Sequence, residues 1–341
     1  MKFQDLALLT VDERSDYIRT AAAESGLSEL IVEKDFWVVW LLEQLFALSS
    51  TVGPFTFKGG TSLSKGFSAI QRFSEDIDIS IGRATLGFPD EKYFYETPSG
   101  KETKRRVEQI RDVVRQYAVE SLLPALRDRL AGKIQGAWSL ESGDPGSLRF
   151  QYPTKQIGTI GYIKPDVLIE FGHADSWPAT DVTISPYLVE ALEPLTGSIS
   201  VRVLDPQRTF WEKATILHEI AHRDELIPFP LGYSRHYYDL ARLDRTDIGT
   251  SAVQNTALLE AVVHFKSVFF ASNRARYDLA KPGSLRLIPP AFRRNAIEDD
   301  YAQMSAMIFG AIPTFDEIIQ GLADLEARIN GRATTAVKSA Q

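Results

Sequence analysis

The segment 55–81 constrains the fold of this chain more than any other. Two short strand-like runs, 55–57 and 76–81, enclose the turn Gly59-Gly60 and a helical pattern over 61–70. Glycine lets the backbone N–H groups of such a turn approach an anion closely. A helix that begins directly after the turn adds favourable potential for phosphate at its N-terminus. The segment therefore predicts a strand, a phosphate-binding turn, a helix and a second strand.

The second strand carries two acidic residues, Asp76 and Asp78, separated by one position. Because side chains alternate along a strand, both carboxylates project from one face. Carboxylates held this close repel each other unless a cation lies between them, and a hard divalent ion such as Mg²⁺ or Mn²⁺ suits the pair. A glycine turn alone is often only a tight turn, and such a pair is often only solvated. Their combination, flanked by Lys58 and Arg72, favours nucleotidyl transfer.

The two runs 58–63 (Lys-Gly-Gly-Thr-Ser-Leu) and 72–78 (Arg-Phe-Ser-Glu-Asp-Ile-Asp) carry a family resemblance. They resemble the nucleotidyltransferase motif of the DNA polymerase β-like superfamily, and more specifically the AbiEii/AbiGii-type (MenT-like) toxin family. Thr61 stands where the superfamily more often has Ser, and both offer a hydroxyl. The resemblance extends, with gaps, over residues 33–330.

A third carboxylate is expected on a neighbouring strand, because two-metal nucleotidyl transfer usually needs one. The run 164–172 offers Asp166 and Glu170, which point the same way in a regular strand. Related sequences place Glu before a small hydrophobic–Gly pair, so we expect Glu170 to be the ligand and Asp166 to be an exposed or supporting residue.

The family pattern also pairs a Glu-Lys with an Arg-x-x-x-Asp, and residues 212–213 and 235–239 match it. Lys213 would neutralise triphosphate charge as a compact cation, and Asp239 would orient Lys213 or bind the sugar or base of the nucleotide. Without the family, the two would form a structural ion pair. The resemblance thus implies the following sites: metal-binding and catalytic Asp76, Asp78 and Glu170; catalytic Lys213 and Asp239; nucleotide-binding Lys58, Gly59, Gly60, Thr61, Ser62, Ser74 and Lys213.

The implied activity is transfer of NMP from an NTP to an acceptor, with the tRNA 3′ end as the expected acceptor. The protein would be the Mg²⁺- or Mn²⁺-dependent toxin of a type IV toxin–antitoxin or phage-defence pair, with an antitoxin protein as partner. The identity of the NTP, and the choice between tRNA, another RNA and a protein as acceptor, stay open. A catalytically silent nucleotide-binding regulator is the alternative, and intact Asp76 and Asp78 argue against it.

The run His218-Glu219-Ile220-Ala221-His222 matches the His-Glu-x-x-His signature of zinc metalloproteases. In that interpretation, the two histidines bind zinc, Glu219 activates water and a distal residue supplies the third ligand. Short motifs match by chance, and the run lies within the helix that the toxin family explains better. The metalloprotease is therefore the weaker hypothesis.

The composition is that of a globular protein, with 44% hydrophobic and 24% charged residues among 341. The absence of cysteine excludes disulfides and thiolate metal sites and fits a cytoplasmic protein. The N-terminus lacks the layout of a signal peptide, and the most apolar segment, 36–48, is too short to span a membrane. A net charge of −7 means that any nucleic-acid partner needs a local basic patch.

We expect an α+β fold, with a nucleotidyltransferase-type mixed sheet and flanking helices followed by a mostly helical half. Residues 1–204 would hold the core, 205–330 would complete the active site, and 331–341 would be a disordered tail. Residues 83–100 and 174–198 are expected to be irregular. Further helices are expected at 11–25, 28–49, 101–131, 206–222, 235–243, 253–272, 297–309 and 314–330, and further strands at 133–140, 148–152, 161–171 and 198–204.

Two charged segments have a structural and a functional interpretation. The expected helix 101–131 carries Lys101, Lys104, Arg105, Arg106, Arg111 and Arg115, which form either a solvated face or a surface that contacts RNA phosphates. The run Glu33-Lys34-Asp35 enters an apolar helix, and we expect these charges to pair internally as a structural feature.

Overall fold

A computed structural model of the chain describes residues 1–90, 92–156, 163–174 and 178–331. The chain forms two compact units. Unit 1 comprises residues 1–68 and 73–205, and unit 2 comprises residues 69–72 and 206–341. Within the described residues, no helix has the length and apolar character needed to cross a membrane.

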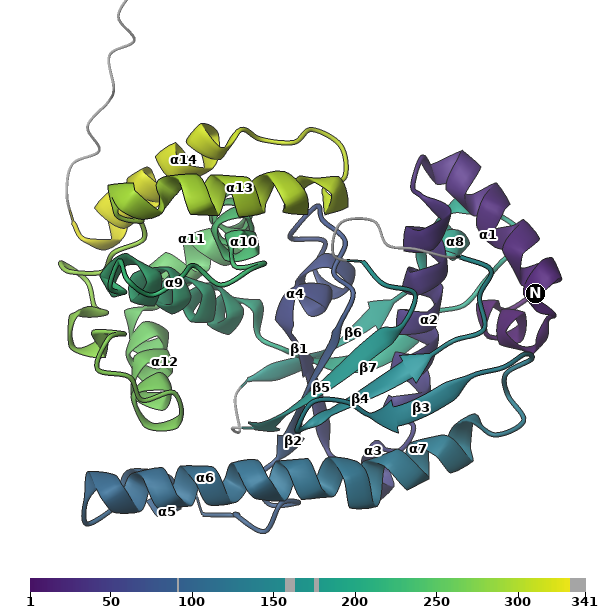
Figure 1. The fold of residues 1–341 in the computed structure, drawn as a ribbon, viewed down its shortest axis with the longest axis horizontal. Coiled ribbons are helices and arrows are strands. Elements are labelled where there is room, and N and C mark those ends of the chain that lie inside the picture. The colour runs from purple at the N-terminus through teal and green to yellow at the C-terminus, as the bar shows by residue number, and fades with distance from the viewer. Residues whose placement is uncertain (91, 157–162, 175–177, 332–341) are drawn as a thin grey trace, which may run out of the picture. The chain divides into compact units, whose positions relative to one another are not determined.

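Unit 1 is built around a seven-stranded mixed sheet with the strand order β3-β4-β5-β2-β1-β7-β6 (Figure 1). The central strand β2 pairs antiparallel with β1 and parallel with β5, and β1 pairs parallel with β7. The strands are β1 (Phe55–Lys58), β2 (Ile77–Gly82), β3 (Ser139–Ser142), β4 (Ser147–Gln151), β5 (Val167–Ala174), β6 (Ala179–Ile184) and β7 (Ile199–Leu204).

Helix α2 (Glu29–Phe46) covers one face of this sheet. Ser28 begins the helix as its N-cap, since its hydroxyl accepts a hydrogen bond from the N–H of Ile31. Trp37 packs against Phe150 of β4, with ring centroids 5.7 Å apart, and Phe46 packs against Phe55 of β1 at 6.3 Å. The apolar residues of β1 and β2 point to this covered face, so the alternate residues point to the opposite face.

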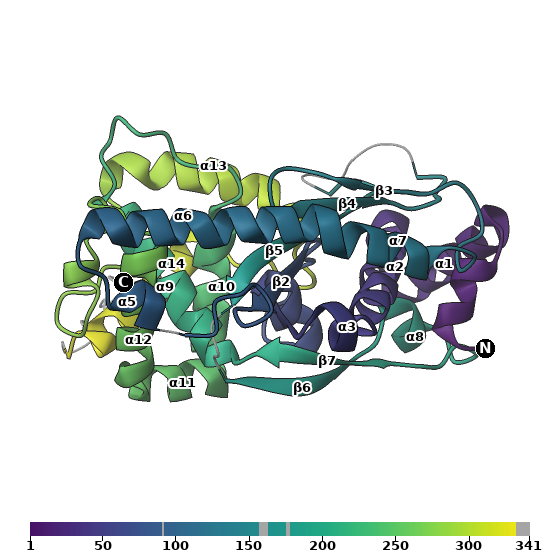
Figure 2. The same ribbon diagram turned by 90° about the horizontal axis from the view of Figure 1, so that it is seen from below.

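The remaining helices of unit 1 lie around the sheet. Figure 2 shows α6 continuing through a short π-helical stretch into α7 as one long helical run. Pro124 occupies the second position of α7, where a missing N–H is tolerated. The bounds are η1 (Phe3–Leu8), α1 (Val11–Ser25), α3 (Ser49–Val52), α4 (Gly59–Thr61), η2 (Ser62–Gly66), α5 (Lys92–Tyr95), α6 (Gly100–Tyr117), η3 (Ala118–Leu122), α7 (Leu123–Leu130) and α8 (Tyr187–Ala191).

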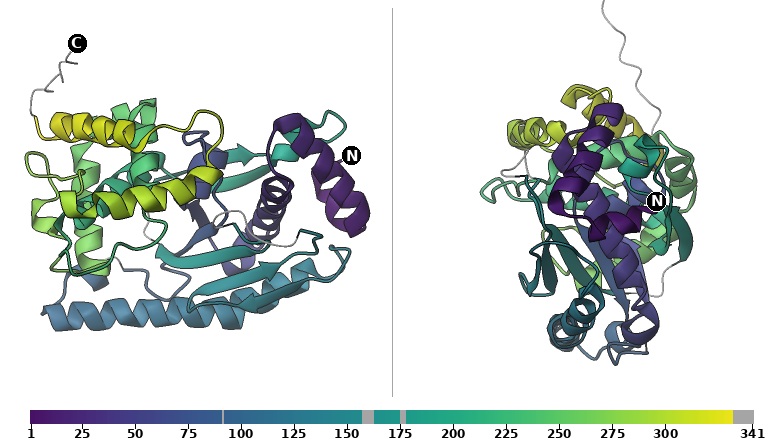
Figure 3. Two further views of the ribbon diagram at one scale, coloured as in Figure 1. Left: turned by 45° about the horizontal axis from the view of Figure 1, so that its top comes forward. Right: turned by 90° about the vertical axis from the view of Figure 1, so that its right-hand side faces the viewer.

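Unit 2 is helical in its described part, with α9 packed against α10, α11 and α12. Helices α13 and α14 lie side by side (Figure 3), where Tyr301 packs on Phe315 with ring centroids 5.9 Å apart. The bounds are α9 (Pro206–His222), α10 (Ser234–Asp244), α11 (Asp247–Gln254), α12 (Thr256–Phe269), η4 (Tyr277–Leu279), η5 (Ala291–Arg293), α13 (Arg294–Met304), η6 (Ser305–Met307) and α14 (Phe315–Ile329).

The α+β fold expected from the sequence is confirmed, because every strand of the sheet precedes residue 205 and the described chain after it is helical. Two expectations are wrong, since the segment 174–198 contains β6 and α8 and the segment 83–100 contains α5. The helix expected at 253–272 is confirmed as α12, and α11 before it was not expected. The helix expected over 61–70 begins at Gly59 and ends at Gly66. Residues 332–341 of the expected tail lie outside the described residues.

Candidate active site

Three charged residues of unit 1 lie in one row across the face of the sheet opposite to α2. Lys58 of β1 is the register partner of Asp78 of β2, and Asp78 is the register partner of Glu170 of β5. Register partners project to the same side of a sheet. A Cβ atom built on Gly172 would lie 3.8 Å from Lys58 Cε, so the lysine stem reaches across β2 toward β5. One cation and two carboxylates therefore share this face.

The glycine turn lies directly against Asp78. Gly59 has φ +78°, a conformation that L-residues with side chains rarely adopt. A Cβ atom at this position would lie 1.9 Å from Oδ2 of Asp78, which is far inside van der Waals contact. Only glycine allows the turn and the carboxylate to approach this closely.

Two buried hydroxyls hold the turn in place. Thr61 Oγ1 donates to the carbonyl oxygen of Asp76 at 2.6 Å, and Ser62 Oγ donates to the carbonyl oxygen of Gly59 at 2.9 Å. Each residue is 1% exposed. The hydroxyl protons of Thr61 and Ser62 are thus engaged within the protein, and Thr61 ties the turn to the segment that carries the aspartates. Ser74 and Gly60 are both half-buried.

The electrostatic setting of Asp76 reflects crowding of acidic groups. The pKa of Asp76 is raised to about 7, mainly by burial and further by the carboxylates of Glu75, Asp78 and Glu170, against the opposing effect of Lys34. A divalent cation would relieve this repulsion. Within the described ranges, no three His, Cys, Asp or Glu side chains are grouped closely enough to form a metal site. The carboxylate oxygens of Asp76, Asp78 and Glu170 are ligands that suit a hard cation. In this structure they do not converge on a single coordination site.

Asp166, the other candidate for the third carboxylate, has a partner of its own. Its Oδ2 accepts a hydrogen bond from Arg149 of β4 at 2.7 Å, just before β5 begins. Glu170 is exposed and is the register partner of Asp78. The sequence offered Asp166 and Glu170 as the third carboxylate. This arrangement favours Glu170.

Unit 2 contains a buried ionic cluster centred on Asp239 of α10. Arg72 binds both oxygens of this carboxylate, with Nε 2.7 Å from Oδ1 and Nη2 2.8 Å from Oδ2, and Lys213 Nζ of α9 lies 2.7 Å from Oδ2. Asp239 is completely buried, and Arg72 and Lys213 are nearly so. The sequence left two roles open for Asp239, contact with Lys213 or with the nucleotide, and the structure shows the contact with Lys213. The sequence presented Arg72 only as a flanking cation and did not indicate that its fork-shaped guanidinium is the bidentate partner.

The cluster carries two cations and one anion in a buried setting. Burial alone would raise the pKa of Asp239, but Arg72 and Lys213 outweigh it and hold this pKa below its usual range. Burial lowers the pKa of Lys213, assisted by Arg72 and Arg235, although Asp239 opposes the change. His236, whose pKa burial and Lys213 also lower, lies in the same positive surroundings.

The His-Glu-x-x-His run does not form a zinc site. His218 is fully buried, and both of its ring nitrogens are hydrogen-bonded: Nε2 to the carbonyl oxygen of Arg276 at 3.0 Å, and Nδ1 to the N–H of Arg286 at 2.9 Å. His222 Nδ1 bonds the carbonyl oxygen of His218. With both nitrogens of His218 occupied, the helix uses this histidine to hold the loop that follows α12.

The arginines of α6 bind acidic neighbours on their own helix. Arg105 and Arg106 both bind Glu102, and Arg106 also stacks over Tyr93 at 4.4 Å. Farther along, Arg111 binds Glu108 and Arg115 binds Asp112. Lys101 and Lys104 are exposed. These contacts favour the solvated face for the arginines and leave the two lysines as the better candidates for contacts with RNA.

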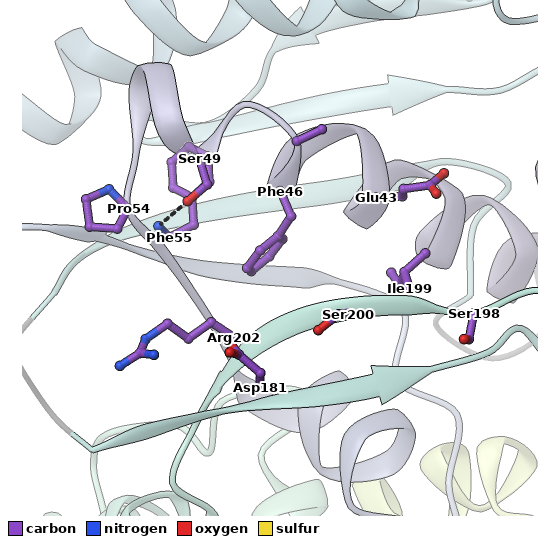
Figure 4. Close-up of a pocket in the computed structure, with 11 residues that line it drawn as sticks. Glu43, Phe46, Ser49, Pro54, Phe55, Asp181, Ser198, Ile199, Ser200 and Arg202 are labelled. Carbon is purple, nitrogen blue, oxygen red and sulfur yellow. Dashed lines mark hydrogen bonds between the residues drawn. The ribbon is translucent and has the colours of Figure 1, made fainter.

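A cavity of about 540 Å³ lies elsewhere in unit 1 (Figure 4). Its walls come from the end of α2, the segment that leads into β1, and strands β6 and β7. Phe46 and Glu43 project into it from the helix, and Arg202 and Asp181 line the opposite side. None of the candidate site residues lines this cavity.

Comparison with known proteins identifies the class of this protein as a nucleotidyltransferase. A family model described as "Nucleotidyl transferase AbiEii toxin, Type IV TA system" matches residues 40–321. Because this is well over half of the chain, the protein belongs to the AbiEii family of nucleotidyltransferase toxins of type IV toxin–antitoxin systems. The family resemblance seen in the sequence is confirmed, over a span slightly shorter than the expected 33–330.

Among solved structures, the chain is similar to MenT4, a nucleotidyltransferase toxin from Mycobacterium tuberculosis H37Rv. The two share 16% sequence identity with a TM-score of 0.37, and the match covers 84% of this chain and 98% of MenT4. No curated protein matches the chain.

Proposed function

We propose that this protein transfers NMP from an NTP to the 3′ end of tRNA, with Mg²⁺ or Mn²⁺ as cofactor. The observation that carries the proposal is the row of Lys58, Asp78 and Glu170 on one face of the sheet, with the Gly59 turn against Asp78. As a type IV toxin, the protein would have a cognate antitoxin partner and would act in the cytoplasm, where NTPs and tRNA are found. A role in phage defence belongs to the same proposal.

In the proposed reaction, the 3′-hydroxyl oxygen of the acceptor bonds to the α-phosphorus of the NTP. The bond from that phosphorus to the bridging oxygen breaks, pyrophosphate leaves, and the hydroxyl proton passes to solvent. Asp76, Asp78 and Glu170 would hold the metal, which when bound neutralises phosphate charge and activates the attacking hydroxyl.

The protein's own groups would position the triphosphate. The backbone N–H groups of the Gly59–Gly60 turn would bind phosphate oxygens, since a glycine turn allows close approach. Lys58 would add a compact positive charge on the same face of the sheet. Ser74, which lies two residues before Asp76 in the sequence, would contact the nucleotide. In unit 2, Lys213 would neutralise phosphate charge while Asp239 orients its ammonium group.

The decisive test incubates the purified full chain with each labelled NTP in turn, with Mg²⁺ and either total tRNA or cell lysate. Label on tRNA supports the proposal, and label on another RNA or on protein changes the acceptor. Label on nothing, with NTP still bound, would favour a silent nucleotide-binding regulator. Calorimetry adds a second test, because NTP binding that is unaffected by a chelator would overturn the metal requirement.

A further inference from the structure

One turn of α2 carries three consecutive charged side chains into the interior of unit 1. Glu33, Lys34 and Asp35 are 2%, 1% and 1% exposed, in a helix that is otherwise mostly apolar. Consecutive residues of an α-helix point about 100° apart, so three neighbours meet three different surroundings. These charges pair internally, as the sequence led us to expect, and each of them binds another segment of the chain.

Lys34 binds the chain just ahead of the two strands that carry the candidate carboxylates. Its Nζ forms an ion pair with Glu75, the residue before Asp76, and donates to the carbonyl oxygen of Lys164 at 2.9 Å. Lys164 lies three residues before β5, the strand of Glu170. One ammonium group therefore fixes the starts of both strands relative to α2.

Asp35 binds the segment that follows the glycine turn. One of its oxygens lies 3.0 Å from Lys65 Nζ in η2, and the other accepts a hydrogen bond from the N–H of Tyr187 at 2.6 Å. Lys65 also lies 3.6 Å above the ring of Tyr187. The charge of Lys65 is thus used to hold the helical segment that runs on from Gly59.

Glu33 is equally buried and binds a segment that carries no candidate site residue. It accepts a hydrogen bond from Thr154 Oγ1 at 2.5 Å, after the end of β4. This residue therefore provides a matched control on the same turn of the same helix.

We propose that Lys34 and Asp35 are positioning residues for nucleotidyl transfer. Lys34 fixes the run from Glu75 to Asp78, and Asp35 fixes the turn from Gly59 to Gly66. Well-packed apolar side chains would serve stability at least as well as buried ion pairs, so the geometry that the charges impose is their function. The inference rests on the proposed function, because it assigns these residues to the same site.

The test compares Lys34→Met, Asp35→Asn and Glu33→Gln in the full chain. Melting temperature, Mn²⁺ binding without nucleotide, and the kcat and KM of transfer are measured for each. Displacement of catalytic groups by about 1 Å can cost on the order of 100-fold in rate, so Lys34→Met should lower kcat by about that factor. The same variant should weaken binding of Mn²⁺ alone, while KM for NTP changes little.

Asp35→Asn should act mainly on the nucleotide. Loss of a charge-assisted hydrogen bond that orders the turn is expected to raise KM for NTP by about tenfold, with a smaller change in kcat. Glu33→Gln should leave both parameters and Mn²⁺ binding close to those of the unmodified protein. Equal behaviour of all three variants would overturn the inference.

A second pair of variants covers the case in which Lys34→Met does not fold. Glu75 is the more exposed partner of that ion pair, so Glu75→Gln removes the contact from the other side. It should lower kcat in the same direction, and unchanged kinetics would refute the role of Lys34. If both single variants fold, the double variant should be no worse than Lys34→Met, because the two share one interaction. Failure of the proposed function appears separately, as an unmodified protein that transfers no label.

Discussion

The two sets of candidate site residues differ in how their charges are balanced. In unit 1, burial and the nearby carboxylates of Glu75, Asp78 and Glu170 raise the pKa of Asp76. In the helices of unit 2, Asp239 lies between two cations and is held ionised. The first set is repulsive by itself and becomes favourable only when a cation arrives. The second set already pairs its one carboxylate with two cations, so removal of that carboxylate should affect folding as well as transfer.

The largest expected difference comes from Asp78→Ala. Loss of a metal carboxylate should lower transfer by about 1,000-fold or more, because a metal ion contributes several kcal/mol of transition-state stabilisation. The free energy of unfolding should change by less than about 1 kcal/mol, since no attractive contact is lost. Labelled transfer and urea denaturation measure the two quantities. An active Asp78→Ala variant would end the nucleotidyltransferase proposal.

Asp239→Asn should show the opposite balance. It leaves Arg72 and Lys213 buried without a counter-charge, and the loss of one partner of a buried ion pair costs about 3–5 kcal/mol. Asp244→Asn is the matched control on the same helix, because Asp244 binds the partly exposed Arg328, and a pair of that kind contributes about 1 kcal/mol or less. Urea midpoints that agree for the two variants would remove the contrast between the two sets.

Glu33→Gln extends the comparison of buried charges to the pH dependence of the free energy of unfolding. Burial raises the pKa of Glu33 to about 7, although Thr154 and Arg14 oppose the shift. Because this folded-state pKa lies above the unfolded value, the stability contributed by protonated Glu33 is complete below about pH 4.5 and is lost as the pH rises through about 7. Relative to Glu33→Gln, the unmodified protein should therefore lose up to about 3 kcal/mol between pH 4.5 and pH 8. Parallel stability curves for the two proteins would contradict the assignment.

The smallest effect is expected on α6. Replacing Lys101 and Lys104 by Ala should make the plot of log K for RNA binding against log salt concentration less steep. The slope should fall by about 1 per lysine, because each contact with a phosphate releases a counterion. NTP affinity should not change. Arg105→Ala is the control, since its guanidinium already binds Glu102. Gel shifts over a salt series decide the matter, and unchanged slopes would mean that RNA binds elsewhere.

Local signals allowed much of the fold to be predicted from the sequence. Helix α1 has the expected bounds because Thr10 and Glu13 form a reciprocal cap at its start. Strand β6 was missed because its residues are mostly half-buried or exposed, so they lack the apolar alternation on which strand prediction depends. Pro178 before it and Pro186 after it made the whole segment resemble a loop.

Part of the candidate site could be predicted from the sequence for the same reason, because its signals are local. Strand periodicity predicted a shared face for Asp76 and Asp78, and Gly59-Gly60 predicted the turn, although Asp76 lies just before β2. The register of Glu170 against Asp78 joins strands that are about ninety residues apart, and no local pattern specifies it. The partners of Lys34 and Arg72 are also distant in sequence, so no local pattern indicated what these two side chains bind.

The assignment of residues 69–72 to unit 2 has a consequence for how the protein is made. Arg72 is synthesised early, but its partner Asp239 follows 167 residues later. At roughly 5–20 residues per second, a ribosome needs on the order of 10–30 seconds to cover that interval. During this time the nascent chain already contains the glycine turn before Arg72 and the acidic strand after it, while Asp239, the carboxylate that binds this guanidinium, has not yet been made. A nascent toxin therefore exists for many seconds before the ion pair that closes its second unit can form.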